Sequence, residues 1–271
     1  MRFYLYNLGI PLLCALAIFV AFDLTDLDLH LSNLLWDPAQ GSFLYGHNEL
    51  FERVTHKWAR ILPDWVGEGA VIGLLASLVW PLLARLLPPP RLARLQGQRL
   101  GRTLKAAASL RRDCLYITLA FALSTGLIHY FKSHTGIYCP VETVLYGGSE
   151  AKLEWYRTFR LFAEAGSGRC WPGGHASSAF SLVALYFVAR RHGWAHSSLL
   201  LLVIGLLGML YGTTRVLQGW HFMSHTLWAA VIVWLPSFGM ALACYGRAAL
   251  EQPLARRRER SVGIFPIGNN G

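Results

Sequence analysis

The chain has few charged residues. Only 15% of its 271 residues are Asp, Glu, Lys or Arg, whereas 54% are hydrophobic and the mean hydropathy is +0.37. Soluble domains carry about 25% charged residues, so this chain lacks the polar surface of a water-soluble globule. The ten Trp and fourteen Phe also exclude a disordered or low-complexity chain. The composition therefore favours a membrane protein.

Acidic side chains are especially scarce. The sequence has 15 acidic and 25 basic residues, for a formal net charge of +10. A basic excess is found in nucleic-acid-binding proteins, but also in inner-membrane proteins, whose Lys and Arg gather on the cytoplasmic side. The positions of the charges distinguish these two classes.

Long apolar runs supply candidates for membrane-spanning helices, which need about 20 mostly apolar residues. The first run is not followed by a small-residue cleavage site, so we interpret it as a retained span and not as a signal peptide. We predict an all-α, polytopic membrane protein with six transmembrane helices in one domain over residues 1–255, followed by a cytoplasmic tail at 256–271. The predicted spans are residues 5–22, 66–87, 114–131, 176–189, 197–211 and 226–245.

The distribution of charge predicts the orientation. An even number of spans puts both termini on one side, which then holds sixteen basic and three acidic residues against nine basic and twelve acidic on the other. By the positive-inside rule the termini are cytoplasmic, and residues 23–65, 132–174 and 212–225 are outer loops. We expect a multi-pass protein in the lipid bilayer of a bacterial inner membrane, with no nucleic-acid partner.

Polar residues cluster in three segments at the expected outer boundary. Lys132 ends the third predicted span, a Trp-Pro-Gly-Gly-His run at 171–175 precedes the fourth, and residues 214–225 join the fifth to the sixth. Ionisable side chains at membrane depth are costly and mark functional sites. Because all three segments lie on the same expected face, we predict one active site there, on the periplasmic side.

The residue types in these segments suit phosphate chemistry. Two fixed cations can bind a doubly charged oxyanion, and two glycines let backbone amides approach an anion at a helix start. Two histidines can divide the roles of nucleophile and general acid. These three segments contain no acidic cluster that could hold magnesium, so we predict a metal-independent phosphoryl transfer without a cofactor. The candidate residues are Lys132, Gly173, Gly174, His175, Arg215 and His221.

In order and spacing these motifs resemble the type 2 phosphatidic acid phosphatase superfamily, the membrane lipid phosphatases related to vanadium haloperoxidases and glucose-6-phosphatase. The family pattern is Lys-x6-Arg-Pro, then Pro-Ser-Gly-His, then Ser-Arg-x5-His-x3-Asp. The matching positions are Lys132 with Pro140, then Pro172, Gly174 and His175, then Arg215 and His221.

The resemblance implies hydrolysis of a phosphoric monoester or diphosphate of a membrane lipid at the outer leaflet. It implies that His221 attacks phosphorus and forms a phosphohistidine. His175 would protonate the leaving group and then activate water, while Lys132 and Arg215 hold phosphate oxygens. The candidate substrates are an isoprenoid pyrophosphate carrier, phosphatidate, phosphatidylglycerophosphate and a lipid A phosphate.

Four positions depart from the family pattern. They are Cys139 in place of Arg, Gly173 in place of Ser, Thr214 in place of Ser, and His225 in place of Asp. Loss of an arginine that stabilises developing charge costs about 3 kcal/mol, so we predict that Arg169 binds phosphate as its substitute. His225 lies four residues after His221 on a helix start, where its ring can accept from the nucleophile and orient it.

Two alternatives concern the cysteines and a metal. Cys139 and Cys170 are the cysteines of the expected outer loops, where an oxidising compartment would allow a disulfide. Free thiols are the alternative.

His221 and His225 also have the spacing of a zinc-binding pair, with His175 or Cys170 as a third ligand. Against zinc, the two neighbouring cations would repel a metal ion.

Two alternatives concern the activity. The same phosphohistidine would serve a phosphotransferase that passes phosphate from one lipid to another. The departures from the family pattern would also suit a non-catalytic lipid-binding membrane protein with a degenerate site.

Overall fold

A computed structural model describes residues 2–46 and 48–251 of the chain, which are mostly helical. The N-terminal part contains α1 (Arg2–Tyr4), the π-helix η1 (Leu5–Gly9), α2 (Ile10–Ile18), the π-helix η2 (Phe19–Asp23), α3 (Leu27–Asn33), β1 (Trp36–Asp37), β2 (Ser42–Phe43), α4 (Glu49–Glu52), the π-helix η3 (Arg53–Trp58) and α5 (Ile61–Leu86). The remainder contains α6 (Pro89–Gly97), α7 (Arg99–Ser109), α8 (Arg111–Thr135), the 3₁₀-helices η4 (Pro140–Glu142) and η5 (Val144–Tyr146), α9 (Trp155–Thr158), α10 (Gly174–Phe180), α11 (Val183–Arg191), α12 (Ser197–Leu217), α13 (Met223–Tyr245) and α14 (Arg247–Glu251).

The structure confirms a mostly helical chain with several helices that can cross a membrane. Within the described residues, five helical segments are long and apolar enough: Arg2–Asp23, Glu49–Leu86, Arg111–Glu142, Ser197–Leu217 and Met223–Tyr245. The predicted span at 176–189 is instead divided between α10 and α11. Serine side chains that bond back to helix carbonyls bend helices, and Ser181 Oγ donates to Ser177 O (2.8 Å) at this break.

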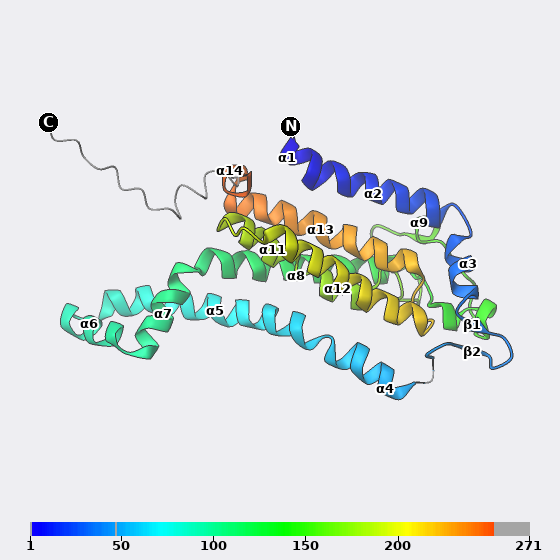
Figure 1. Ribbon diagram of the computed structural model, residues 1–271, viewed down its shortest axis with the longest axis horizontal. Helices are drawn as coiled ribbons and strands as arrows, with labels where there is room; N and C mark the ends of the chain where they lie inside the picture. Colours follow the sequence, from blue (N-terminus) through cyan, green and yellow to red (C-terminus); the bar gives the residue numbers. More distant parts are fainter. Residues whose placement is uncertain (1, 47, 252–271) are drawn as a thin grey trace.

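The long helices form one bundle. In Figure 1, α2, α5, α8, α12 and α13 run side by side, and α8 packs against both α5 and α13. The core between α8, α11 and α13 contains the fully buried side chains of Tyr116, Phe187 and Val233. The helix α10 packs against both α12 and α13. The start of α10, the end of α12 and the start of α13 therefore come together at one end of the bundle.

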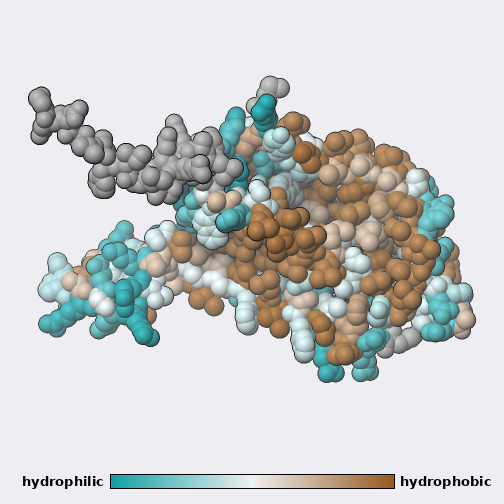
Figure 2. Space-filling view, in the orientation of Figure 1, coloured by the Kyte–Doolittle hydropathy of each residue, from teal (hydrophilic) through white to brown (hydrophobic). Residues whose placement is uncertain are grey.

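The two ends of the bundle differ. The helices α6 and α7 project from one end, whereas α3, the β1–β2 hairpin and α9 lie at the other (Figure 1). Figure 2 shows hydrophobic residues over the bundle and hydrophilic residues at both ends. The hairpin pairs Trp36 with Phe43, so the predicted outer loop at 23–65 contains defined structure.

The boundaries of the third predicted outer loop also differ from the prediction. Residues 212–217 continue α12, which ends at Leu217, and α13 begins at Met223. The loop between the last two long helices is therefore short. The predicted tail at 256–271 lies outside the described residues.

A buried carboxylate joins three helices at the end that carries α6 and α7. Asp113 of α8 accepts from Tyr245 Oη of α13 (2.8 Å) and from His192 Nε2 after α11 (2.7 Å), and it also pairs with Arg191. Its side chain is 5% exposed. These contacts fix α8, which carries Lys132 at its opposite end, relative to α13, which carries His225 at its opposite end.

A glycine brings α12 and α13 close together near that opposite end. A Cβ atom at Gly212 would lie 2.1 Å from Thr226 Cγ2, a distance that no side chain can occupy. Small residues let membrane helices approach closely. Gly212 therefore sets the spacing between the last turn of α12 and the first turn of α13, which carry motif residues.

Candidate active site

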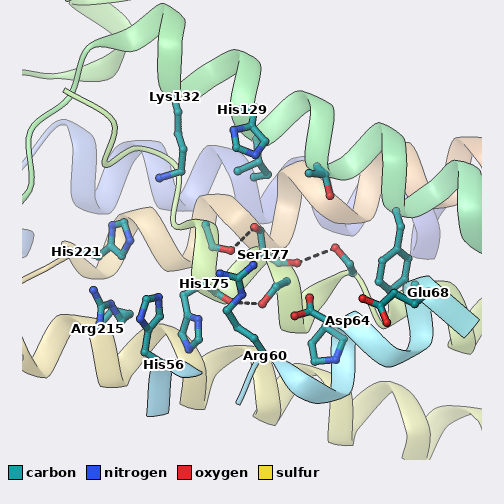
Figure 3. Close-up of a pocket in the computed structure, with 18 residues that line it drawn as sticks. His56, Arg60, Asp64, Glu68, His129, Lys132, His175, Ser177, Arg215 and His221 are labelled. Carbon is teal, nitrogen blue, oxygen red and sulfur yellow. Dashed lines mark hydrogen bonds between the residues drawn. The ribbon is translucent and has the colours of Figure 1, made fainter. Parts of the chain in front are cut away.

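Residues from all three sequence motifs line one cavity of about 570 Å³ (Figure 3). Lys132 reaches it from the last turn of α8, His175 from the first turn of α10, and Arg215 from the last turn of α12. His221 lies two residues before α13, and Gly174 also lines the cavity. The structure thus brings together the two cations and the two histidines expected to act on phosphate.

Lys132 lies against the glycine motif. The helix α8 ends at Thr135 and is followed by Gly136, whose φ of 65° is in the left-handed region that favours glycine. The Lys132 ammonium donates to the backbone carbonyl of Arg169. A Cβ atom at Gly174 would lie 3.2 Å from Lys132 Cε, so the missing side chain leaves room for the lysine beside the start of α10.

The two histidines of the third motif are in contact. Nδ1 of His221 and Nδ1 of His225 lie 3.3 Å apart. Burial, together with the positive charges of Lys132 and Arg215, lowers the pKa of His221 well below its ordinary value. His221 is therefore neutral at neutral pH, as a nucleophilic imidazole must be.

Two long-range hydrogen bonds hold the start of α13. Asp28 Oδ1 of α3 accepts from Ser224 N (3.0 Å), and burial raises the pKa of this carboxyl. The Gly173 amide donates to the carbonyl of His225 (2.9 Å). This corrects the prediction that Gly173 donates to phosphate, because its amide is already used to hold the motif-three turn.

His175 is oriented by the chain that precedes α5. Its Nε2 donates to the backbone carbonyl of Thr55 (2.6 Å), and its ring stacks on Tyr211 with centroids 5.0 Å apart. Burial lowers the pKa of His175 to about 4. Nδ1 of this neutral ring is buried and has no hydrogen-bond partner among the residues that the structure describes.

Arg215 is held by a carboxylate from the N-terminal part of the chain. Its Nη1 donates to Glu52 Oε2 (2.6 Å) and to Gln218 Oε1 (2.9 Å). Glu52 Oε1 also lies 2.8 Å from His56 Nδ1. Arg215 itself is 8% exposed. The guanidinium therefore has a fixed position at the edge of the cavity.

The comparisons with known proteins agree with the motifs. The family model of the PAP2 superfamily matches residues 113–247, about half of the chain. The chain belongs to the PAP2 superfamily. No curated protein and no solved structure matches the chain. The PAP2 match contains all three motifs, from Lys132 to His225, whereas residues 2–112 lie outside it.

Two residues that line the cavity precede the PAP2 match and were not predicted from the sequence. His56 and Arg60 line the cavity next to the motif residues. They lie around the π-helix η3, and π-helical turns are frequent at functional sites. The carbonyls of Thr55 and Ala59 accept from His175 and from Tyr211 Oη here. The four-residue spacing of His56, Arg60, Asp64 and Glu68, which puts them on one helix face, is a signal that could have found them.

The structure does not bring the Arg169 guanidinium to the cavity, which corrects its prediction as a phosphate ligand. Its Nη2 donates to Glu164 Oε2 (3.0 Å) and its Nη1 to Gly168 O (2.8 Å). Only its backbone carbonyl reaches the site, as the acceptor of Lys132. The acidic neighbour five residues earlier binds the side chain in the loop.

Cys139 and Cys170 form a disulfide between the first and second motifs, with Cα atoms 5.2 Å apart. Glu142 lies beside them, and its Oε2 accepts from the Cys139 amide (2.6 Å). A disulfide offers no thiolate to a metal, so Cys170 is not available as the third ligand of a zinc site with His221 and His225.

Proposed function

We propose that the protein is a metal-independent phosphatase that hydrolyses a lipid phosphate or pyrophosphate through a phosphohistidine intermediate. The observation that carries the proposal is the shared cavity of Lys132, His175, Arg215 and His221. This set supplies two cations for the phosphate oxygens, a neutral imidazole as nucleophile, and a second imidazole for proton transfer.

His225 supports His221 as the nucleophile by selecting its tautomer. When His225 Nδ1 is unprotonated, it accepts the Nδ1 proton of His221 across the 3.3 Å between them. The lone pair of His221 is then on Nε2. A neutral partner stabilises the developing imidazolium less than a carboxylate does, but it fixes the same orientation.

In the first step, His221 Nε2 forms a bond to phosphorus as the bond from phosphorus to the leaving oxygen breaks. His175 gives a proton to that oxygen. The dianionic phosphate in the cavity raises the pKa of His175, so that it carries the second proton when substrate is bound. In the second step, His175 takes a proton from water, and the resulting hydroxide attacks phosphorus and releases inorganic phosphate and neutral His221.

An apolar groove supports a lipid as the substrate. A groove of about 780 Å³ between α5 and α8 is lined mainly by apolar side chains, among them Ile72 and Phe121. Phe121, Glu68 and His129 line both this groove and the active-site cavity. Both helices belong to candidate spans, so the tail of a membrane lipid can lie in the groove while its head group occupies the cavity.

The charge distribution supports the outer leaflet of a bacterial inner membrane as the site of action. The helices α6 and α7 carry Arg91, Arg94, Arg99, Arg102 and Lys105 at the end of the bundle opposite α3. By the positive-inside rule this end is cytoplasmic. The cavity, at the other end, then opens on the periplasmic side.

The test is phosphate release by purified protein from single lipid phosphates in detergent, with and without EDTA. The panel contains phosphatidate, phosphatidylglycerophosphate, an isoprenoid pyrophosphate and a lipid A phosphate. We expect release from at least one lipid, unaffected by EDTA and nearly abolished in His221→Ala and His175→Ala, whereas His196→Ala, at an exposed position, keeps it.

Release without an acceptor lipid counts against a dedicated lipid-to-lipid phosphotransferase. Equal activity of wild type and His221→Ala would contradict the proposed mechanism. Absence of release from every lipid of the panel would favour the non-catalytic lipid-binding alternative.

A further inference from the structure

The site lacks the cation that the family pattern places in its first motif. The corresponding residue is Cys139, which is bonded to Cys170. Arg169 does not replace it, because its guanidinium is bound to Glu164. The cavity nevertheless has a third cationic side chain beside Lys132 and Arg215, namely that of Arg60.

Arg60 enters the cavity from a part of the chain outside the three motifs. It is the residue immediately before α5. In Figure 3 its side chain rises from the start of α5 toward His175 and Ser177. Its positive charge adds to burial in lowering the pKa of His175, which is consistent with a short distance between the two groups.

The Arg60 guanidinium is free to bind a ligand. Within residues 2–46 and 48–251, it has neither a salt bridge nor a side-chain hydrogen bond, even though Asp64 lies one turn further along the same face. In contrast, Arg215 is bound to Glu52. Arg60 is thus an uncommitted cation in a cavity that already contains Lys132.

The backbone on the N-terminal side of Arg60 is held against the motif helices. His175 donates to the carbonyl of Thr55, and Tyr211 Oη donates to the carbonyl of Ala59, the residue next to Arg60. These bonds come from α10 and α12. The start of α5 is therefore positioned by the same two helices that carry His175 and Arg215.

We propose that Arg60 binds the non-bridging oxygens of the transferred phosphoryl group and takes the place of the missing motif-one arginine. The inference rests on the proposed phosphatase function. A guanidinium presents two parallel N–H donors that match two phosphate oxygens, and it stabilises the charge that develops on them in the transition state. This chain therefore obtains its third phosphate-binding side chain from the region before α5.

The first test compares kcat and KM of Arg60→Gln, Arg60→Lys and Lys57→Gln for phosphate release. Lys57→Gln is the matched control, because it removes the same charge from an exposed position on the same segment. We expect kcat/KM to fall about 100-fold in Arg60→Gln, mainly through kcat. We expect a fall of about tenfold in Arg60→Lys, which keeps the positive charge but loses the two parallel N–H donors of the guanidinium. Lys57→Gln should match wild type.

The second test does not require turnover. Orthovanadate, a phosphate analogue, should raise the thermal unfolding midpoint of wild type and of Lys57→Gln, and should raise that of Arg60→Gln much less. Wild-type kinetics or wild-type vanadate stabilisation in Arg60→Gln would overturn the proposal. If Arg60→Gln does not unfold cooperatively, the same two readouts in Arg60→Lys decide.

The two tests separate this proposal from the proposed function. If wild type releases no phosphate from any lipid but vanadate stabilises it in an Arg60-dependent manner, the hydrolase proposal fails and the binding role of Arg60 stands. If wild type is active and Arg60→Gln is equally active, the phosphatase stands and the role of Arg60 is contradicted.

Discussion

Nδ1 of His221 and Nδ1 of His225 lie 3.3 Å apart at the start of α13. The pair occupies the place where the motif of the PAP2 superfamily has histidine and aspartate. The Gly173 amide donates to the His225 carbonyl, and Asp28 accepts from the amide of Ser224, the residue before His225. The position of the His221 ring therefore depends on residues from α3, the segment before α10, and α13 itself.

The first prediction concerns His225. We expect His225→Ala to lower kcat by about 10- to 100-fold with little change in KM, because the ring of His221 loses its acceptor but phosphate binding is retained. His225→Asp should recover the lost kcat. The measurement is steady-state phosphate release. An unchanged kcat in His225→Ala would contradict the positioning role.

The second prediction concerns pH. Because burial and nearby cations lower the pKa of His221, its ring stays unprotonated as the pH falls through about 6.5, where a free imidazole gains a proton. Diethyl pyrocarbonate modifies an imidazole ring only when the ring is neutral. The rate at which the reagent modifies His221, measured by peptide mass spectrometry, should therefore persist toward pH 5. The rate of modification of N-acetylhistidine should fall over the same range. Parallel loss of both rates would show that the pKa is not lowered.

The third prediction concerns the contact between α12 and α13. A Cβ atom at Gly212 would overlap Thr226, whereas one at Gly205 of the same helix meets nothing within 4 Å. We expect Gly212→Ala to lower the free energy of unfolding by about 1–3 kcal/mol and to reduce activity by displacing Arg215. Gly205→Ala should be neutral or stabilising. The measurement is the thermal unfolding midpoint of each variant in detergent. Equal midpoints for Gly212→Ala and Gly205→Ala would contradict the prediction.

The fourth prediction concerns the disulfide. Cys139 and Cys170 are separated by 31 residues in the sequence, and closing a loop of this size contributes roughly 3 kcal/mol. The double variant Cys139→Ser with Cys170→Ser should be less stable by about that amount. Dithiothreitol should destabilise wild type and leave the double variant unchanged. A wild type insensitive to the reductant would contradict a stabilising disulfide.

The motif residues could be predicted from the sequence because each lies at a boundary between an apolar run and a polar segment. Lys132 is in the last turn of α8, and His175 is in the first turn of α10. Helix boundaries of this kind are visible in local composition. Given six expected spans, the order of the segments alone placed Lys132, His175 and Arg215 on one face.

Other features have no local signal. Glu52 binds Arg215 across 163 positions of the sequence, and nothing near Glu52 indicates that partner. Arg169 was predicted from its proximity to the second motif, but Glu164 competes for its side chain. At the break between α10 and α11 the Ser181 hydroxyl bonds to the Ser177 carbonyl, whereas the hydropathy of the sequence shows only one apolar run.

The most direct test of the proposed mechanism is to locate the covalent intermediate on the chain. Wild type and His175→Ala are quenched in alkali during turnover of a lipid phosphate, and their peptides are analysed by mass spectrometry. We predict an acid-labile phosphoryl group on His221 of wild type, much less of it in His175→Ala, which lacks the acid that protonates the leaving oxygen, and none in His221→Ala. Phosphate release by wild type with the phosphoryl group on another residue would contradict the account.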